Sequence, residues 1–135
     1  MLTLDQANAM LAAARHCAAA RGFAPVSIYV LDAAAYPLAF ARMDGCFLGA
    51  IDVALGKART AALFRADSAA VGAHFRPGAP AFSLENTNGG LVGFGGGVAL
   101  RNAQGDCVGA IGVSGATMEE DQLIAEAGAA ALAQG

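Results

Sequence analysis

One cationic side chain stands out because of its neighbours along a predicted helix. Lys57 lies within residues 48–64, and the positions three and four away from it are mostly apolar: Val53, Ala54, Thr60 and Ala61. A lysine in such surroundings either extends its ammonium to water along its aliphatic stem, the commoner outcome, or lies partly desolvated with a lowered pKa. Desolvated lysines bind anions or act as bases. Lys57 is therefore a candidate catalytic residue.

Two charged residues close a predicted strand at residues 38–44. Arg42 and Asp44 are two positions apart, so their side chains leave the strand on the same face. One interpretation is an ion pair at the edge of a sheet, which contributes little to stability. The other is a charged group at the mouth of a cleft.

A run of acids, Glu119, Glu120 and Asp121, opens the last predicted helix. Acidic side chains are favoured in the first turn of a helix, because the helix dipole places partial positive charge there. That effect explains the run without any chemistry. The functional alternative gives Asp121, or Asp44 in its place, the role of moving a proton beside a bound anion.

The two histidines, His16 and His74, belong to no HExxH or CxxCH pattern. His16 falls on the flank of the first predicted helix, where a surface histidine is the commoner case. Histidine is also the commonest metal ligand, so each is a candidate metal ligand. Together with a methionine it would bind haem iron axially, and the candidates are Met10, Met43 and Met118.

Residues 88–100 read NGGLVGFGGGVAL, which contains six glycines. The spacing excludes GxGxxG, because Val98 and Leu100 stand where the last glycine is required. Two interpretations remain. The glycines allow close backbone packing within a strand, or they form a pocket wall whose backbone N–H groups face a ligand.

The elements that must position these residues follow from capping and periodicity. Thr3 with Gln6, and Thr117 with Glu120, are capping boxes that begin the first and last helices. Strands are predicted at 26–32, 38–44, within the glycine-rich stretch, and as a hairpin over 98–115 with NAQGD as its turn. Helix 48–64 and a short helix from Asp67 or Ser68 to Phe75 complete the order. Hairpin connections of this kind predict an antiparallel sheet covered by helices, an α+β domain.

Composition limits the function classes. The 135 residues suggest one domain, 1–135, and 56% are hydrophobic whereas only 14% are charged. No apolar run is long enough to span a membrane, so the imbalance favours a homo-oligomer. A net charge of -3 without a basic cluster argues against nucleic acid. No secretory signal is evident, and three widely spaced cysteines predict a reducing, cytoplasmic setting.

Several segments together resemble the GlcG/HbpS family, which includes the C-terminal domain of PduO-type proteins. They are LTLDQA, SIYVLDAAAYPLAFARMDG, IDVALGKARTAALF, the glycine-rich block and VGAIGVSGATMEEDQLIAEAG, which cover essentially the whole chain. The resemblance implies a profilin-like α/β/α sandwich with an antiparallel sheet of about five strands, homo-oligomers, and binding of haem or corrinoid-related molecules. The positions matching the shared pocket are Arg42, Asp44, Lys57, Gly95, Gly96, Gly97, Gly115 and Asp121.

The sequence also departs from the family. Tyr36 stands where a turn glycine is usual, and Gly49 replaces a frequent serine. Where relatives have PGG before a valine, this chain has Phe94 and Gly95 ahead of the paired glycines. That change falls on the predicted pocket wall, so Phe94 and Gly95 are expected to influence ligand choice.

Two hypotheses follow. The first is a small oligomeric binding protein for haem or a related tetrapyrrole, supported by the resemblance and by the available histidine and methionine ligands. The second is an enzyme acting on a small carboxylate or aromatic-derived metabolite, in which Lys57 and Arg42 hold the anion and Asp121 or Asp44 moves a proton. A wide slot with a histidine at its rim favours the first, and a small closed pocket around Lys57 favours the second.

Overall fold

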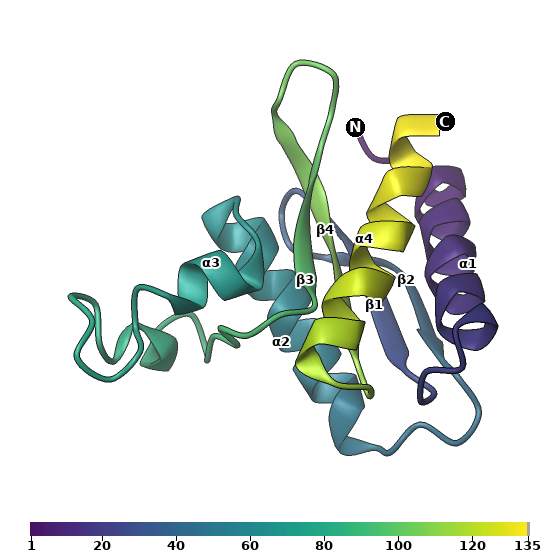
Figure 1. Cartoon of the computed structure of the whole chain (residues 1–135). Helices are drawn as coiled ribbons and strands as arrows, with labels where there is room; N and C mark the ends of the chain where they lie inside the picture. Colours follow the sequence, from purple (N-terminus) through teal and green to yellow (C-terminus); the bar gives the residue numbers. More distant parts are fainter. Residues whose placement is uncertain (135) are drawn as a thin grey trace.

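The computed structural model describes residues 1–134 and shows an antiparallel sheet with helices on both faces (Figure 1). A short 3-10 turn, η1, precedes the glycine-rich stretch. The elements in chain order are α1 (Leu4–Ala20), β1 (Ser27–Asp32), β2 (Pro37–Arg42), α2 (Gly49–Phe64), α3 (Ser68–Gly72), η1 (Leu84–Asn86), β3 (Gly97–Arg101), β4 (Cys107–Ser114) and α4 (Met118–Gln134).

Both predicted capping boxes are present. The Thr3 side chain accepts from the Gln6 backbone N–H at 3.1 Å, and the Gln6 side chain accepts from the Thr3 N–H at 2.9 Å. Thr117 and Glu120 make the same reciprocal pair at 3.1 and 3.2 Å. These contacts satisfy backbone donors that a helix start otherwise leaves unpaired, so α1 and α4 begin where the sequence predicts.

The sheet has the order β2-β1-β4-β3, and every neighbouring pair is antiparallel. Both hairpin turns are held by a side-chain carbonyl or carboxylate. Asp32 accepts from the backbone N–H groups of Ala34 and Tyr36, and Asn102 accepts from those of Gln104 and Asp106. This local bonding is what Asp and Asn contribute to turns.

The prediction of about five strands is wrong, because the structure has four. The glycine-rich stretch contributes to the sheet only from Gly97 onward. Asn88, Gly89, Gly90 and Gly96 all have positive φ, between 55° and 125°, which lies outside the β region. The backbone before Gly97 therefore turns instead of extending.

The two faces of the sheet are buried in different ways. On the face covered by α1 and α4, aliphatic side chains form the core: Ile28, Val30, Ile111, Val113, Met10 and Ile124 are fully buried. On the face covered by α2, glycines replace side chains. A Cβ added to Gly112 would overlap the Ala54 carbonyl oxygen, and one added to Gly97 would overlap that of Lys57. The backbone of α2 therefore lies directly on β3 and β4.

Among the described residues 1–134, no helix is both long and apolar enough to cross a membrane.

Candidate functional site

Lys57 is the only lysine in the sequence, and it is buried. Its residue exposure is 1%, although its helix α2 borders solvent. The ammonium donates hydrogen bonds to the carbonyl oxygen of Val113 and to Asp121 Oδ2, each at 2.9 Å. The face of the Phe94 ring lies 5.1 Å from the same nitrogen, within the range of a cation–π contact.

Asp121 reaches Lys57 from the first turn of α4. Its other carboxylate oxygen, Oδ1, accepts from the backbone N–H of Ala116 at 3.0 Å. The capping box at Thr117 and Glu120 fixes this turn, so the carboxylate is held from both sides. The pair is 64 residues apart in sequence and forms the one ion pair found within residues 1–134.

Burial lowers the pKa of Lys57 from its ordinary value of 10.5. The hydrogen bond to Asp121 and the charge of that carboxylate both raise the pKa, but they offset the desolvation only in part. Loss of water is the larger effect because it penalises the ammonium form directly. Lys57 is therefore held as a buried cation whose proton is easier to remove than that of an exposed lysine.

The glycine run closes over Lys57. A Cβ added to Gly96 would lie 2.7 Å from the Lys57 Nζ. The Gly96 N–H donates to Gln122 Oε1, and the Gly97 N–H donates to Ser68 Oγ, both at 2.9 Å. Backbone N–H groups that were candidates for a ligand are thus bonded to side chains of the chain itself.

Ser68 and Gln122 did not emerge from the sequence as site residues. Ser68 is fully buried, and its hydroxyl also donates to the Phe94 carbonyl oxygen at 2.6 Å. The signal for Ser68 was its place at the start of a short helix, where serine is read as a cap. In the structure its side chain makes no capping bond and ties the glycine run to α3 instead.

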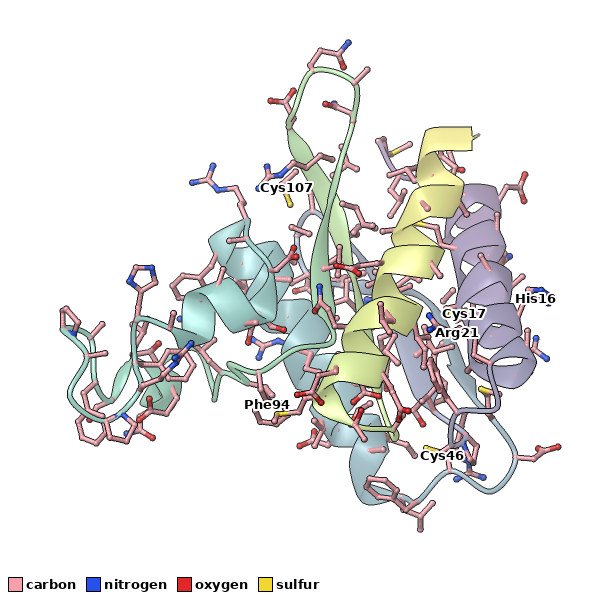
Figure 2. The ribbon with its side chains drawn as sticks, viewed as in Figure 1. His16, Cys17, Arg21, Cys46, Phe94 and Cys107 are labelled. Carbon is pink, nitrogen blue, oxygen red and sulfur yellow. The ribbon has the colours of Figure 1, made fainter. Side chains whose placement is uncertain are left out.

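A hollow of about 430 Å³ lies outside this cluster. Phe94, which Figure 2 shows beside the beginning of α4, lines this hollow and also contacts the Lys57 ammonium. Its lining residues are Ala69, Arg76, Gly93, Phe94, Gly95, Met118, Glu119 and Gln122. Gly95 and Phe94 therefore border open space, whereas Gly96 and Gly97 are buried.

A second group of predicted residues meets in a different place. Arg42 and Asp44, at the end of β2, line a groove of about 730 Å³ together with His16 of α1. Figure 2 shows His16 on the outer side of α1. The groove also contains Arg15, which the sequence had not singled out, and its remaining lining residues are Ala12, Ala19, Ala41 and Met43. Two guanidinium groups, an imidazole, the Asp44 carboxylate and small apolar walls thus share one open surface.

The last two predicted residues lie elsewhere. Gly115, with φ of 136°, packs against the backbone of Pro25 and Val26, where a Cβ would lie 2.6 Å from the Pro25 carbonyl oxygen. His74 follows α3 and is exposed. Since α3 and α1 lie at opposite sides of the molecule (Figure 1), the two histidines of one chain do not approach a common atom.

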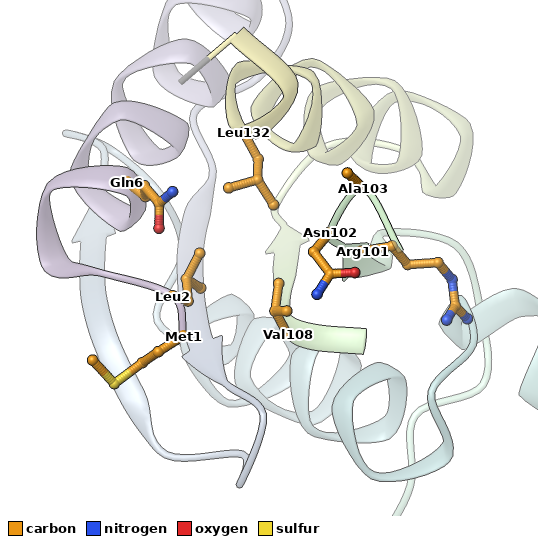
Figure 3. A pocket seen from close by; sticks show the side chains of 8 residues that line it. All are labelled: Met1, Leu2, Gln6, Arg101, Asn102, Ala103, Val108 and Leu132. Carbon is orange, nitrogen blue, oxygen red and sulfur yellow. The ribbon is translucent and has the colours of Figure 1, made fainter. Parts of the chain in front are cut away.

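A further hollow of about 500 Å³ lies where the N-terminal segment, the β3–β4 hairpin and α4 meet (Figure 3). Its basic residue, Arg101, already donates to the carbonyl oxygens of Gly105 and Arg65. None of the predicted site residues lines this hollow. It is lined by Met1, Leu2, Gln6, Arg101, Asn102, Ala103, Val108 and Leu132.

The fold and these sites define a small α+β protein with one closed polar cluster and one open basic groove. Residues 2–130 match the family model described as haem degrading protein HbpS-like, and the chain belongs to this family. It is 39% identical over 103 residues, 76% of this chain and 72% of the relative, to a 15.0 kDa Citrobacter freundii protein encoded in the dhaT-dhaS intergenic region.

Solved structures agree with this assignment. The Klebsiella pneumoniae protein ORFY superposes with a TM-score of 0.93 at 31% identity, covering 98% of this chain and 90% of ORFY. A complex of PduOC with haem superposes with a TM-score of 0.89 at 30% identity, covering 96% of this chain and 94% of PduOC. The family resemblance seen in the sequence is thereby confirmed.

Proposed function

We propose that this protein binds haem or a related tetrapyrrole in the groove between α1 and β2, with His16 as the axial ligand. The observation that carries the proposal is the position of His16 in a groove with Arg15 and Arg42. Haem carries two carboxylates and an apolar macrocycle, and its iron needs only axial ligands from the protein. The HbpS-like family and the haem complex of PduOC support this choice of ligand.

The groove residues match the parts of a haem. A volume of about 730 Å³ lies within the usual range for a small-molecule site. Arg15 and Arg42 would pair with the propionates, and alanine walls allow a flat ring to approach. Of the methionines considered as a second ligand, only Met43 lines the groove, whereas Met10 is buried in the core. A bound haem would supply an iron centre for redox or gas chemistry.

Hemin titration followed at the Soret band tests this proposal. We expect saturable binding by the wild type and at least a tenfold loss of affinity in His16→Ala, because the axial bond is removed. His74→Ala is the matched control and should bind as the wild type does. Equal binding by His16→Ala and the wild type would remove His16 as a ligand and contradict the proposed site.

The proposed assembly is a homo-oligomer of single-domain subunits acting in the cytoplasm. Large apolar side chains on the surface support association: Tyr36 is 71% exposed, Phe47 61% and Leu48 69%. Phe47 and Leu48 are adjacent in the chain, and contiguous exposed apolar surface of this kind marks an interaction site. Light scattering on the purified protein decides this, and a monomer at micromolar concentration contradicts it.

A second candidate function is an enzyme acting on a small carboxylate at Lys57. The observation that favours it is the desolvated Lys57 ammonium, which contacts the Phe94 ring, while Phe94 also lines a hollow of about 430 Å³. Displacement of that ring would expose Lys57 to bind the anion, with Asp121 able to take or give a proton. Arg42 lines the other groove and is left out of this chemistry.

Carboxylate binding measured by calorimetry tests the enzyme candidate. We expect Lys57→Met to abolish the binding of a small carboxylate such as benzoate and to leave hemin binding unchanged. If Lys57→Met and the wild type bind benzoate equally, or if neither binds it, Lys57 is not an anion-binding residue and this candidate is withdrawn.

A further inference from the structure

Residues 73–90 form an arm that extends away from the sheet beyond α3, at the left of Figure 1, and residues 91–96 lead back to the sheet. The arm, the end of α3 and residues 91–94 line an open hollow of about 400 Å³, which is distinct from the groove at His16. Most of its lining is apolar, and two of its residues are charged. The lining residues are Gly72, Phe75, Arg76, Pro77, Phe82, Glu85, Leu91, Val92, Gly93 and Phe94.

Three aromatic rings face this hollow. Phe82 is 59% exposed and Phe94 is 44% exposed, so both leave much of their surface available to a ligand. Phe75 is half-buried, and its ring lies so close to Gly93 that a Cβ there would overlap it. Ring faces bind both apolar groups and cations. The walls therefore fit an apolar body that carries a positive charge.

Glu85 supplies a negative group in the same hollow. Its Oε2 atom is shielded from water and accepts no hydrogen bond from any side chain or backbone group within residues 1–134. Its backbone is fixed, because the Glu85 carbonyl oxygen accepts from the Leu91 N–H at 2.9 Å. A shielded carboxylate oxygen without a partner is costly to the protein, and rotation of the Glu85 side chain toward the hollow would relieve that cost by bringing the carboxylate to a ligand ammonium.

Arg76 lines the same hollow but forms no ion pair with Glu85 within 4.0 Å. Arg76 is exposed, so its guanidinium is accessible to a bound molecule. Two opposite charges that share an apolar hollow without pairing match a ligand that carries both charges itself. A carboxylate on that ligand would bind the planar guanidinium of Arg76.

We propose that this hollow, the arm site, binds a small zwitterionic molecule with an apolar body, of the class of aromatic or aliphatic α-amino acids. The ligand ammonium donates to Glu85, its carboxylate pairs with Arg76, and its side chain packs against the phenylalanine rings. The arm site shares no residue with the His16 groove, so this proposal does not depend on haem binding.

Calorimetric titration with three matched probes tests the arm site. L-phenylalanine has both charges, phenethylamine lacks the carboxylate, and 3-phenylpropionate lacks the amine. We expect L-phenylalanine to bind at least tenfold more tightly than either of the others. Glu85→Gln should weaken L-phenylalanine and phenethylamine at least tenfold, whereas Arg76→Gln should weaken L-phenylalanine and 3-phenylpropionate and leave phenethylamine unchanged.

Controls separate loss of the site from loss of the fold. Both variants should keep the wild-type circular dichroism, oligomeric state and hemin titration, because neither residue lies at the groove. Arg76 is exposed, so Arg76→Gln keeps the test decisive even if Glu85→Gln does not fold. The proposal is wrong if L-phenylalanine does not bind, even when the cause is that another subunit covers the hollow. It is also wrong if all three probes bind equally.

Discussion

The cluster at Lys57 and the groove at His16 contain similar charged groups in opposite circumstances. At Lys57 every polar atom named above has a partner inside the protein, and the residue is 1% exposed. At the groove, Arg15, His16, Arg42 and Asp44 are all exposed and line open space. Charges satisfied internally support the structure, whereas exposed charges that converge on a groove are available to a ligand. The comparison predicts that substitutions will affect stability at Lys57 and binding at His16.

The largest expected effect is that of Asp121→Ala. It leaves the buried Lys57 ammonium with only a neutral carbonyl partner, and breaking a buried ion pair in this way costs about 3–5 kcal/mol of unfolding free energy. Arg42→Ala is the matched control and should change stability by less than about 0.5 kcal/mol. Urea unfolding measures the free energy of unfolding of both variants. Similar losses in Asp121→Ala and Arg42→Ala would contradict the prediction.

Removing both partners should restore much of that loss. Lys57→Met combined with Asp121→Leu replaces the ion pair by apolar groups, and such replacements are often neutral or stabilising. We expect the double variant to unfold at a higher urea concentration than Asp121→Ala or Lys57→Met alone. Additive losses in this double-mutant cycle would show that the two side chains act independently.

A smaller effect is expected at the groove. Arg15→Gln and Arg42→Gln should each weaken hemin binding about two- to fivefold, because a solvent-exposed ion pair contributes a free energy of about that magnitude. The Lys57→Met, Asp121→Leu double variant should bind hemin as the wild type does. A loss of hemin affinity in that double variant, with the fold intact, would mean that the two regions are coupled.

The smallest predicted effect is a dependence of stability on pH. Between the lowered pKa of folded Lys57 and the unfolded value of about 10.4, the unfolded chain holds a proton that the folded chain has released. Stability should therefore rise with pH across this window, and the rise should be absent in Lys57→Met. NMR of the Lys57 Cε carbon measures the folded pKa directly, and a value at or above 10.5 contradicts the expectation.

Much of the fold could be predicted because local signals act over a few residues. The capping boxes at Thr3 and Thr117 and the turn at Asn102 were visible in the sequence, and all three form as local bonding requires. The glycine-rich stretch was misread because glycine is compatible with both extended and positive-φ backbone. Only the packing of Gly97 on α2 shows where the turn ends and the strand begins.

The sites were less predictable, because they depend on contacts between distant segments. Lys57 was identified from its apolar neighbours, but no local pattern indicates that it meets Asp121. Arg15 and Gln122 are ordinary polar residues on helices, and only the packing of those helices brings them to the groove and to Gly96. Glu85 was missed because its shielded oxygen depends on the arm folding back on itself.

Because the only lysine in the sequence is buried, chemical labelling of its amine would detect local opening of the native protein. The described surface offers amine-directed reagents no lysine side chain, because the single one in the sequence is 1% exposed. A reagent of this kind would reach Lys57 only when α4 and the glycine run separate from α2. The rate at which Lys57 is labelled would therefore measure how often those segments separate in the native protein.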